Sequence, residues 1–264
     1  MKNRFLYALL LSLTFVAGCD ALSSEPTYGG LSIEGFNYTP YNLDRFVITD
    51  KYGNKAGGGG DLMPGSGEGS LSCCYKLKGT DFTVDWYVMD QDEFLKDPYG
   101  PLQEIHKVTR VHFPPTKLDG GAGERILGLH FYPDDHIEFE FRHDLRGTRI
   151  FYAEIDDWLD KKQGKTFDPS SYDDAVAFRR TARVASEGWL KYRLTNTQDL
   201  EQYVYYRLLV NPDFDKHPAI QRILADTKGK PGAFGAAMEK LPTPIVEQLK
   251  RDTFEHIQTG ATHG

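Results

Sequence analysis

Apolar and polar residues alternate along much of the first half of this chain. The clearest alternation covers residues 81–88, where every second residue from Phe82 to Val88 is large and apolar. Alternate side chains of a strand point to the same face, so this segment predicts a half-buried strand. Shorter apolar or alternating runs predict further strands at residues 46–48, 108–113, 127–131 and 137–141. The last two runs are separated by the turn residues 133–135 and predict a hairpin.

Beyond residue 145 the apolar positions recur with the period of a helix. Four apolar residues between Leu200 and Leu208 fall on one helical face, and Asn211-Pro212 ends that element. Further helices are predicted to begin at Asp168-Pro169 and to cover residues 218–224 and 243–257. The sequence therefore predicts an α+β protein, with an antiparallel β-rich domain at residues 31–145 and a mainly helical region at residues 146–264.

A glycine-rich stretch separates the strand at residues 46–48 from the next apolar run. Seven glycines occur from Gly57 to Gly69, and the stretch ends at the adjacent pair Cys73-Cys74. Such a composition offers few side chains for packing, so it predicts a loop between two short strands. It lacks both the G-x-G-x-x-G spacing between a strand and a helix and the Gly-Lys-Ser/Thr ending that nucleotide sites require. We therefore expect a flexible or partner-contacting loop rather than a phosphate site.

Part of this loop is our candidate for contact with a protein partner. Small residues let a partner's backbone approach closely, and exposed loops on a rigid scaffold often carry recognition. The residues expected at the contact are Gly57, Gly58, Gly59, Gly60, Asp61, Leu62 and Met63.

The adjacent cysteines allow two alternative states. In an oxidising compartment, Cys73 and Cys74 can form a vicinal disulfide, although so small a ring is strained. Alternatively, they are free thiols on opposite faces of one strand, with Cys73 facing inward beside Leu71 and Tyr75 and Cys74 facing outward. The sequence favours neither state over the other.

The chain begins as a secretory signal does. A positively charged start precedes an apolar run at residues 5–16, which is too short to span a bilayer. Val16-Ala17-Gly18-Cys19 resembles a bacterial lipobox. That resemblance implies that residues 1–18 are a signal peptide, that Cys19 is diacylated, and that residues 19–30 form a lipidated tether. The alternative is an ordinary secretory signal with an unrelated cysteine.

Charge and position 20 bear on where the mature chain works. Removal of Lys2 and Arg4 with the signal peptide takes the formal net charge from −7 to −9. Such a surface repels nucleic acid and anionic lipid head groups, so we expect no nucleic-acid partner and a membrane attachment through acyl chains alone. Asp20 favours retention at the inner membrane by the rule known for enteric bacteria, but other bacteria read other positions. We expect a place in the cell envelope facing the periplasm, with the choice of membrane open.

Candidate catalytic and metal-binding groups are few. His136, Glu138 and Glu140 would share the solvent face of the predicted hairpin, a grouping that a divalent metal accepts; the alternative is a solvated charged face. The nearest match to G-x-S-x-G is the stretch around Ser186, which lacks the first glycine and falls in a helix-like segment. We therefore expect neither enzymatic activity nor a cofactor.

The ordered combination of these features resembles a known family. Gly35-Phe36-Asn37-Tyr38-Thr39 follows the lipobox, and then come an apolar strand, the glycine run and Cys73-Cys74. Over about residues 16–90, this order resembles proteobacterial lipoproteins that are found as immunity proteins beside lipase effectors of the type VI secretion system. The resemblance implies a lipoprotein that binds and inhibits a secreted lipase, and it transfers no catalytic residue. The alternative is a general envelope lipoprotein that scaffolds a complex or binds a ligand.

Overall fold

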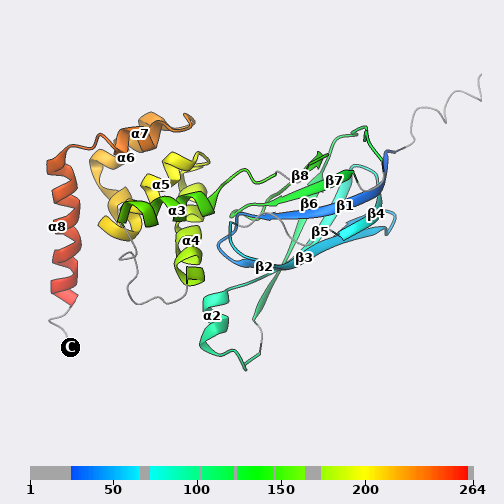
Figure 1. Ribbon diagram of the computed structural model, residues 1–264, viewed down its shortest axis with the longest axis horizontal. Coiled ribbons are helices and arrows are strands. Elements are labelled where there is room, and N and C mark those ends of the chain that lie inside the picture. Colours follow the sequence, from blue (N-terminus) through cyan, green and yellow to red (C-terminus); the bar gives the residue numbers. More distant parts are fainter. Residues whose placement is uncertain are drawn as a thin grey trace, which may run out of the picture.

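The computed structural model describes residues 25–65, 72–101, 103–121, 124–144, 147–163 and 174–260, with side chains up to Arg251 in the last helix. A β-sandwich forms the first part of the chain, and a group of helices forms the second (Figure 1). The predicted α+β class is therefore confirmed. Among the described residues, no helix has the length and apolar character that crossing a bilayer requires.

The first sheet of the sandwich has the strand order β4-β1-β7-β8. Its strands are β1 (Thr27–Asn37), β4 (Ser72–Lys78), β7 (Arg125–Phe131) and β8 (Ile137–Arg142). The β7–β8 pair is the predicted hairpin, with Leu129 opposite Phe139. β1 pairs in parallel with β7, whereas its pairing with β4 is antiparallel. The predicted antiparallel region thus contains one parallel pair.

The second sheet has the strand order β3-β2-β5-β6, and all its pairs are antiparallel. Its strands are β2 (Asn42–Asp50), β3 (Lys55–Leu62), β5 (Asp81–Met89) and β6 (Glu104–His112). The alternation predicted for residues 81–88 is confirmed, because Phe82, Val84, Trp86 and Val88 are all buried in the core between the two sheets.

The prediction of a loop at Gly57–Gly69 is wrong for the first half of this stretch. Residues 57–62 belong to β3, which pairs along its length with β2. The glycines make room for Phe46, since a Cβ atom at Gly58 would lie 2.8 Å from the Phe46 ring. Gly59 has a φ of +128°, and a Cβ there would lie 2.5 Å from the backbone oxygen of Asp44. These small residues serve close packing rather than flexibility.

One boundary also differs from the prediction. β1 begins at Thr27, so the tether predicted for residues 19–30 overlaps the first strand. Tyr28 is already buried in the sandwich core, which explains why pairing with β4 starts this early. Residues 19–24 and the helix start at Asp168-Pro169 lie outside the described residues.

The second part of the chain is helical as predicted. The run that ends at Asn211 is one α-helix continued by a π-helical turn, and the helices predicted at residues 218–224 and 243–257 are present. The helical elements are α3 (Tyr152–Gln163), α4 (Asp174–Tyr192), α5 (Thr197–Tyr205), the π-helix η3 (Tyr206–Val210), the 3-10 helix η4 (Phe214–Lys216), α6 (Pro218–Thr227), α7 (Ala233–Met238) and α8 (Thr243–Gly260).

A short helix, α2 (Gln91–Lys96), interrupts the sandwich between β5 and β6. Its first turn is capped by Asp90, whose carboxylate accepts hydrogen bonds from the backbone N–H groups of Asp92 and Glu93. We did not predict this helix. Figure 1 shows α2 projecting from the sandwich on the side where α4 lies.

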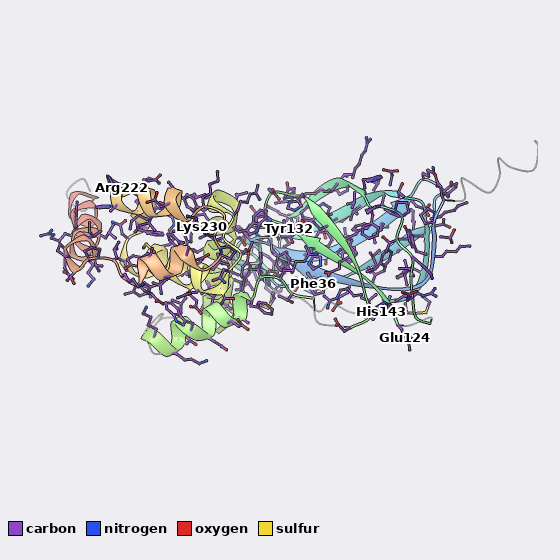
Figure 2. The ribbon with its side chains drawn as sticks, turned by 90° about the horizontal axis from the view of Figure 1, so that it is seen from above. Phe36, Glu124, Tyr132, His143, Arg222 and Lys230 are labelled. Carbon is purple, nitrogen blue, oxygen red and sulfur yellow. A yellow bond between two sulfur atoms is a disulfide. The ribbon has the colours of Figure 1, made fainter. Side chains whose placement is uncertain are left out.

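The sandwich and the helices share a packed junction. Phe36, Tyr38 and Tyr132 come from the ends of the sandwich strands, yet they belong to the same buried cluster as the helical core. Figure 2 shows Phe36 and Tyr132 between the two regions, whereas Glu124 and His143 lie at the far end of the sandwich. β1 and β7 of the first sheet thus end at the core of the helical region.

Candidate functional site

A chain of polar side chains runs through the junction. The Tyr38 hydroxyl lies 3.1 Å from His130 Nδ1, and His130 Nε2 lies 3.0 Å from Glu140 Oε2. His130 also stacks on Phe36 at a ring separation of 4.7 Å. Tyr38 and His130 are fully buried, so no substrate reaches them in this conformation. The tyrosine, imidazole and carboxylate are connected as in a proton relay, but the burial of the tyrosine and the imidazole indicates a structural role.

The charge state of His130 follows from this burial. Burial lowers the pKa of His130 to about 4, and the nearby Arg149 guanidinium acts in the same direction, while Glu140 opposes both. The imidazole is therefore neutral near pH 7. A neutral imidazole has one donor and one acceptor nitrogen, which suits a ring held between a hydroxyl and a carboxylate.

The candidate metal grouping is built around an arginine instead. The Arg149 guanidinium pairs with Glu138 and lies 3.3 Å from Glu140 Oε2. His136 is turned toward Asp134 and stacks on the Tyr132 ring. The cation between these carboxylates is thus a protein side chain. Among the described residues, no group of three or more His, Cys, Asp or Glu side chains has the geometry of a metal site.

Ser186 has no features of a nucleophile. It is buried in α4, and its hydroxyl donates a 2.9 Å hydrogen bond to the Tyr38 backbone oxygen. The Tyr152 hydroxyl donates to the same oxygen at 3.1 Å. These contacts fasten the end of β1 to α3 and α4.

Cys73 and Cys74 are joined by a disulfide in the structure. Both residues are exposed on β4, an edge strand of the first sheet. The alternative in which Cys73 faces inward is therefore wrong, because Cys73 is exposed and the buried side chain of this strand among residues 73–78 is Leu77.

The predicted contact residues occupy mixed positions. Gly60 and Asp61 are exposed at the edge of the second sheet, and the Asp61 carboxylate accepts a hydrogen bond from the Asn42 side chain. Leu62, in contrast, is buried in the sandwich core. The contact at Gly57–Met63 stays a prediction, but the Leu62 side chain packs in the sandwich core and is not exposed to a partner. Cys19, the predicted lipidation site, lies outside the described residues.

A pocket of the sandwich lies around α2, which the sequence analysis did not predict. Two arginines of α4 hold this helix: Arg179 Nε lies 2.9 Å from Asp92, and Arg183 lies 2.5 Å from Asp90 and 3.0 Å from Asp92. Because Arg179 is almost fully buried, its ion pair fixes α2 against the helical region.

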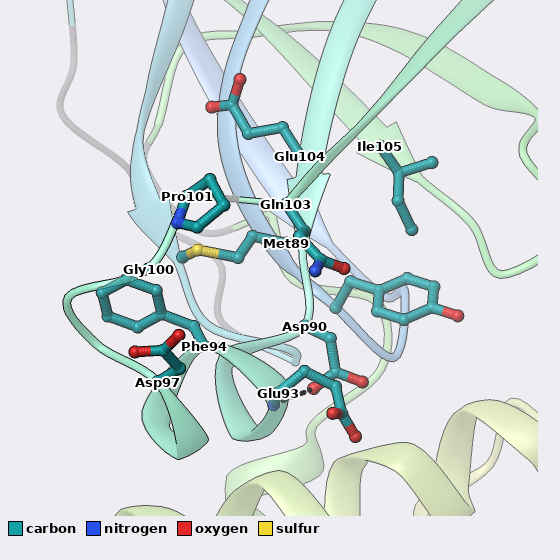
Figure 3. A pocket seen from close by; sticks show the side chains of 11 residues that line it. Met89, Asp90, Glu93, Phe94, Asp97, Gly100, Pro101, Gln103, Glu104 and Ile105 are labelled. Atoms are coloured by element: carbon teal, nitrogen blue, oxygen red, sulfur yellow. Dashed lines mark hydrogen bonds between the residues drawn. The ribbon is translucent and has the colours of Figure 1, made fainter.

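A pocket of about 430 Å³ lies in front of α2. Apolar lining comes from Met89, Phe94, Pro101 and Ile105, and acidic lining from Asp90, Glu93, Asp97 and Glu104. Figure 3 shows Met89, Phe94 and Pro101 at one side of the pocket, with Asp90 and Glu93 at the start of α2.

Four large apolar side chains are exposed close to this pocket in the sequence. Tyr99 is 100% exposed, and Leu95, Ile105 and Val108 are 45%, 43% and 57% exposed. We call these four residues and the pocket the α2–β6 surface. The sequence signal was slight, because Tyr99 stands in a turn-like stretch between Pro98 and Gly100 that predicts a loop but not a binding site.

Comparisons with known proteins found no match. No family model matches the sequence, no curated protein matches it, and no solved structure matches the fold.

Proposed function

We propose that this protein is a lipid-anchored envelope protein, without catalytic activity, that binds a secreted lipase and inhibits it. The observation that carries the binding part is the α2–β6 surface, where Ile105 lines a pocket and three further large apolar side chains close to it in the sequence are exposed. The lipase part rests on the resemblance of residues 16–90 to lipoprotein immunity proteins of type VI secretion systems.

The make-up of the α2–β6 surface supports a protein partner. Single exposed apolar side chains are ordinary, but Leu95, Tyr99, Ile105 and Val108 lie within 14 consecutive residues. Aromatic residues are enriched at the energetic centres of protein interfaces, and Tyr99 has no packing contact that would give it an internal role. Inhibition by covering an active site requires only such a complementary surface.

The position of the surface fits attachment at the amino-terminal end. β1 begins at one end of the sandwich, and α2 lies toward the opposite end (Figure 1). The 11 residues of β1 span about 36 Å at about 3.3 Å per residue. An anchor before β1 would hold the α2–β6 surface away from the lipid, where it meets an approaching lipase at a high effective concentration.

A binding and inhibition assay tests the proposal. The partner is the protein with a G-x-S-x-G motif that the adjacent gene is expected to encode. Purified protein lacking residues 1–19 should bind this lipase and suppress its activity without metal or nucleotide. Tyr99→Ala should weaken binding at least about 30-fold, the loss typical of a central aromatic contact.

Tyr52 provides the matched control. It is a half-exposed tyrosine in the β2–β3 turn, where its hydroxyl donates to Glu25. Tyr52→Ala should leave the affinity within about 3-fold of the unchanged protein. If the unchanged protein fails to bind or inhibit the lipase, a general envelope lipoprotein becomes the better interpretation.

A further inference from the structure

We infer that the pocket in front of α2 receives a lysine or arginine side chain from the partner protein, with Asp97 as its ion-pair acceptor. This inference rests on the proposed function and specifies its binding chemistry. The occupant has two requirements, an apolar stem and a cationic end, and each follows from a different part of the pocket.

The apolar part of the pocket suits an aliphatic stem. Met89 is buried at the end of β5, while Phe94 and Pro101 line the pocket from α2 and the following loop. Lysine and arginine place their methylene groups along such surfaces and keep the charged end in a polar place. A short polar side chain would leave these apolar groups uncovered.

The acidic part favours a positive charge. Three of its four carboxylates already have basic partners: Asp90 pairs with Arg183, Glu93 with Lys96 at 2.6 Å, and Glu104 with Arg45 at 2.6 Å. The Glu93–Lys96 pair is highly exposed on both sides and holds its carboxylate only weakly.

Asp97 differs from the other three carboxylates. Among the described residues, no lysine, arginine or histidine forms an ion pair with it. Gly100 makes room for it, because a Cβ atom at Gly100 would overlap the Asp97 carboxylate. Asp97 is exposed, so the pocket has a solvated and unpaired negative charge at its apolar wall, which an anionic side chain would avoid and a cationic one would neutralise.

The surroundings favour a protein side chain over a free cation. Tyr99 and Leu95 are exposed at the α2 side, and Ile105 and Val108 are exposed on β6. A small cation would cover none of these side chains, whereas a protein that inserts one basic residue would also cover Ile105, which lines the pocket, and the exposed side chains at the α2 side.

Addition of a partner strand to β6 is not the mode that the structure supports. Lys107 points toward the sandwich interior and pairs with Asp135, and the Thr109 hydroxyl donates to the Asp135 backbone oxygen at 3.0 Å. An inward-pointing lysine is a common protection of an edge strand against pairing. The pocket, and not the free backbone of β6, is therefore the specific feature of this surface.

The first test measures binding of the adjacent-gene lipase to the full chain in detergent micelles. Asp97→Lys should weaken binding at least about 30-fold, because it places like charges together in the pocket. Asp226→Lys, an equal charge change on exposed α6, should stay within about 3-fold. If the lipase binds and the two variants behave alike, the pocket inference is overturned while the proposed function stands.

The second test needs no lipase. Nα-acetyl-arginine amide and its neutral isostere Nα-acetyl-citrulline amide are titrated into the full chain, and the backbone amide signals of Glu93, Asp97 and Ile105 are followed by NMR. The arginine compound should shift these signals at a concentration at least about 5-fold lower than the citrulline compound, since only it carries the charge. Equal shifts, or none at these amides, would overturn the inference, and this arm decides even if the unchanged protein binds no lipase.

Discussion

The two edge strands of the second sheet, β3 and β6, differ in how their side chains are used. Half of β3 is glycine, and the ring of Phe46 fills the space that a side chain at Gly58 would take. β6 carries full-sized residues, and two apolar ones, Ile105 and Val108, face solvent. β3, which the sequence predicted to be a loop, is closely packed. β6, which the sequence predicted to be an ordinary strand, exposes large apolar side chains.

This difference shows what small residues indicate. A run of glycines is compatible with a mobile loop and with a strand that another side chain overlies, and composition alone does not separate these cases. Large apolar side chains without cover are the more specific sign of an interface. Four measurements can break or sharpen this comparison.

The largest effect is expected on β3. Gly59→Ala should lower the free energy of unfolding by about 3–5 kcal/mol, because it combines a disfavoured positive φ with a contact of 2.5 Å to backbone. Gly29→Ala on β1 is the control, since its Cβ atom would meet nothing within 4 Å. Urea unfolding of both variants measures the difference, and equal stabilities would mean that β3 is not closely packed.

The next largest effect is expected in the buried junction, where His130 makes the stability depend on pH. The pKa of His130 is lowered to about 4 in the folded protein and is near 6.5 in an unfolded chain. Between these values the unfolded state binds more protons, so this group's stabilisation is complete above about pH 6.5 and is lost as the pH falls toward 4. The loss at pH 4 is on the order of 3 kcal/mol.

His130→Gln isolates this contribution. The glutamine amide retains a donor for Glu140 and an acceptor for Tyr38 but does not titrate. Urea unfolding at several pH values between 7 and 4 should give a shallower decline for the variant than for the unchanged protein. Parallel declines would show that His130 is not held neutral by burial.

A smaller effect is expected on β4, the edge strand of the first sheet, where Cys73 and Cys74 are joined by a disulfide. Replacing both residues by serine should change the free energy of unfolding by less than about 1 kcal/mol, because a disulfide between neighbours closes almost no chain loop. Mass measurement of the non-reduced protein should show two hydrogens fewer than the dithiol form. Alkylation of both sulfurs without prior reduction would contradict the disulfide.

The smallest effect is expected at the α2–β6 surface. Tyr99→Ala and Val108→Thr should each change the free energy of unfolding by less than about 0.5 kcal/mol, because both side chains are mostly in water already. Thermal unfolding measures this directly. A marked loss of stability would mean that these side chains support the fold and are not available to a partner.

The sequence predicted those elements whose side chains repeat with a regular period. Phe82 to Val88 and the hairpin of β7 and β8 could be located because burial alternates along them. The identity of β3 could not, because the ring that covers Gly58 comes from Phe46 on another strand. α2 left a readable sign in Asp90 and Glu93, a capping pair three residues apart.

The candidate site was less accessible to sequence reasoning. Exposure of Tyr99 depends on how α2 is held by Arg179 and Arg183, which are distant in the chain. The grouping of Glu138 and Glu140 was visible as a strand pattern, but the arginine between them was not. The periodicity of a sequence identifies the buried face of a helix or strand. A pocket forms where several elements meet, and the periodicity of one element does not predict that meeting.

The parallel pairing of β1 with β7 sets an order in which the chain can fold. Ile33 lies opposite Leu127, so β1 has to remain incomplete until nearly all of the sandwich has been synthesised. Contacts between such distant segments slow folding, since the chain must close a long loop before they stabilise it. Tyr38 and Tyr132 extend this dependence to the helices, because they follow β1 and β7 into the shared core. We therefore expect the helical region to dock only after β7 is in place, which makes this junction a late step of maturation.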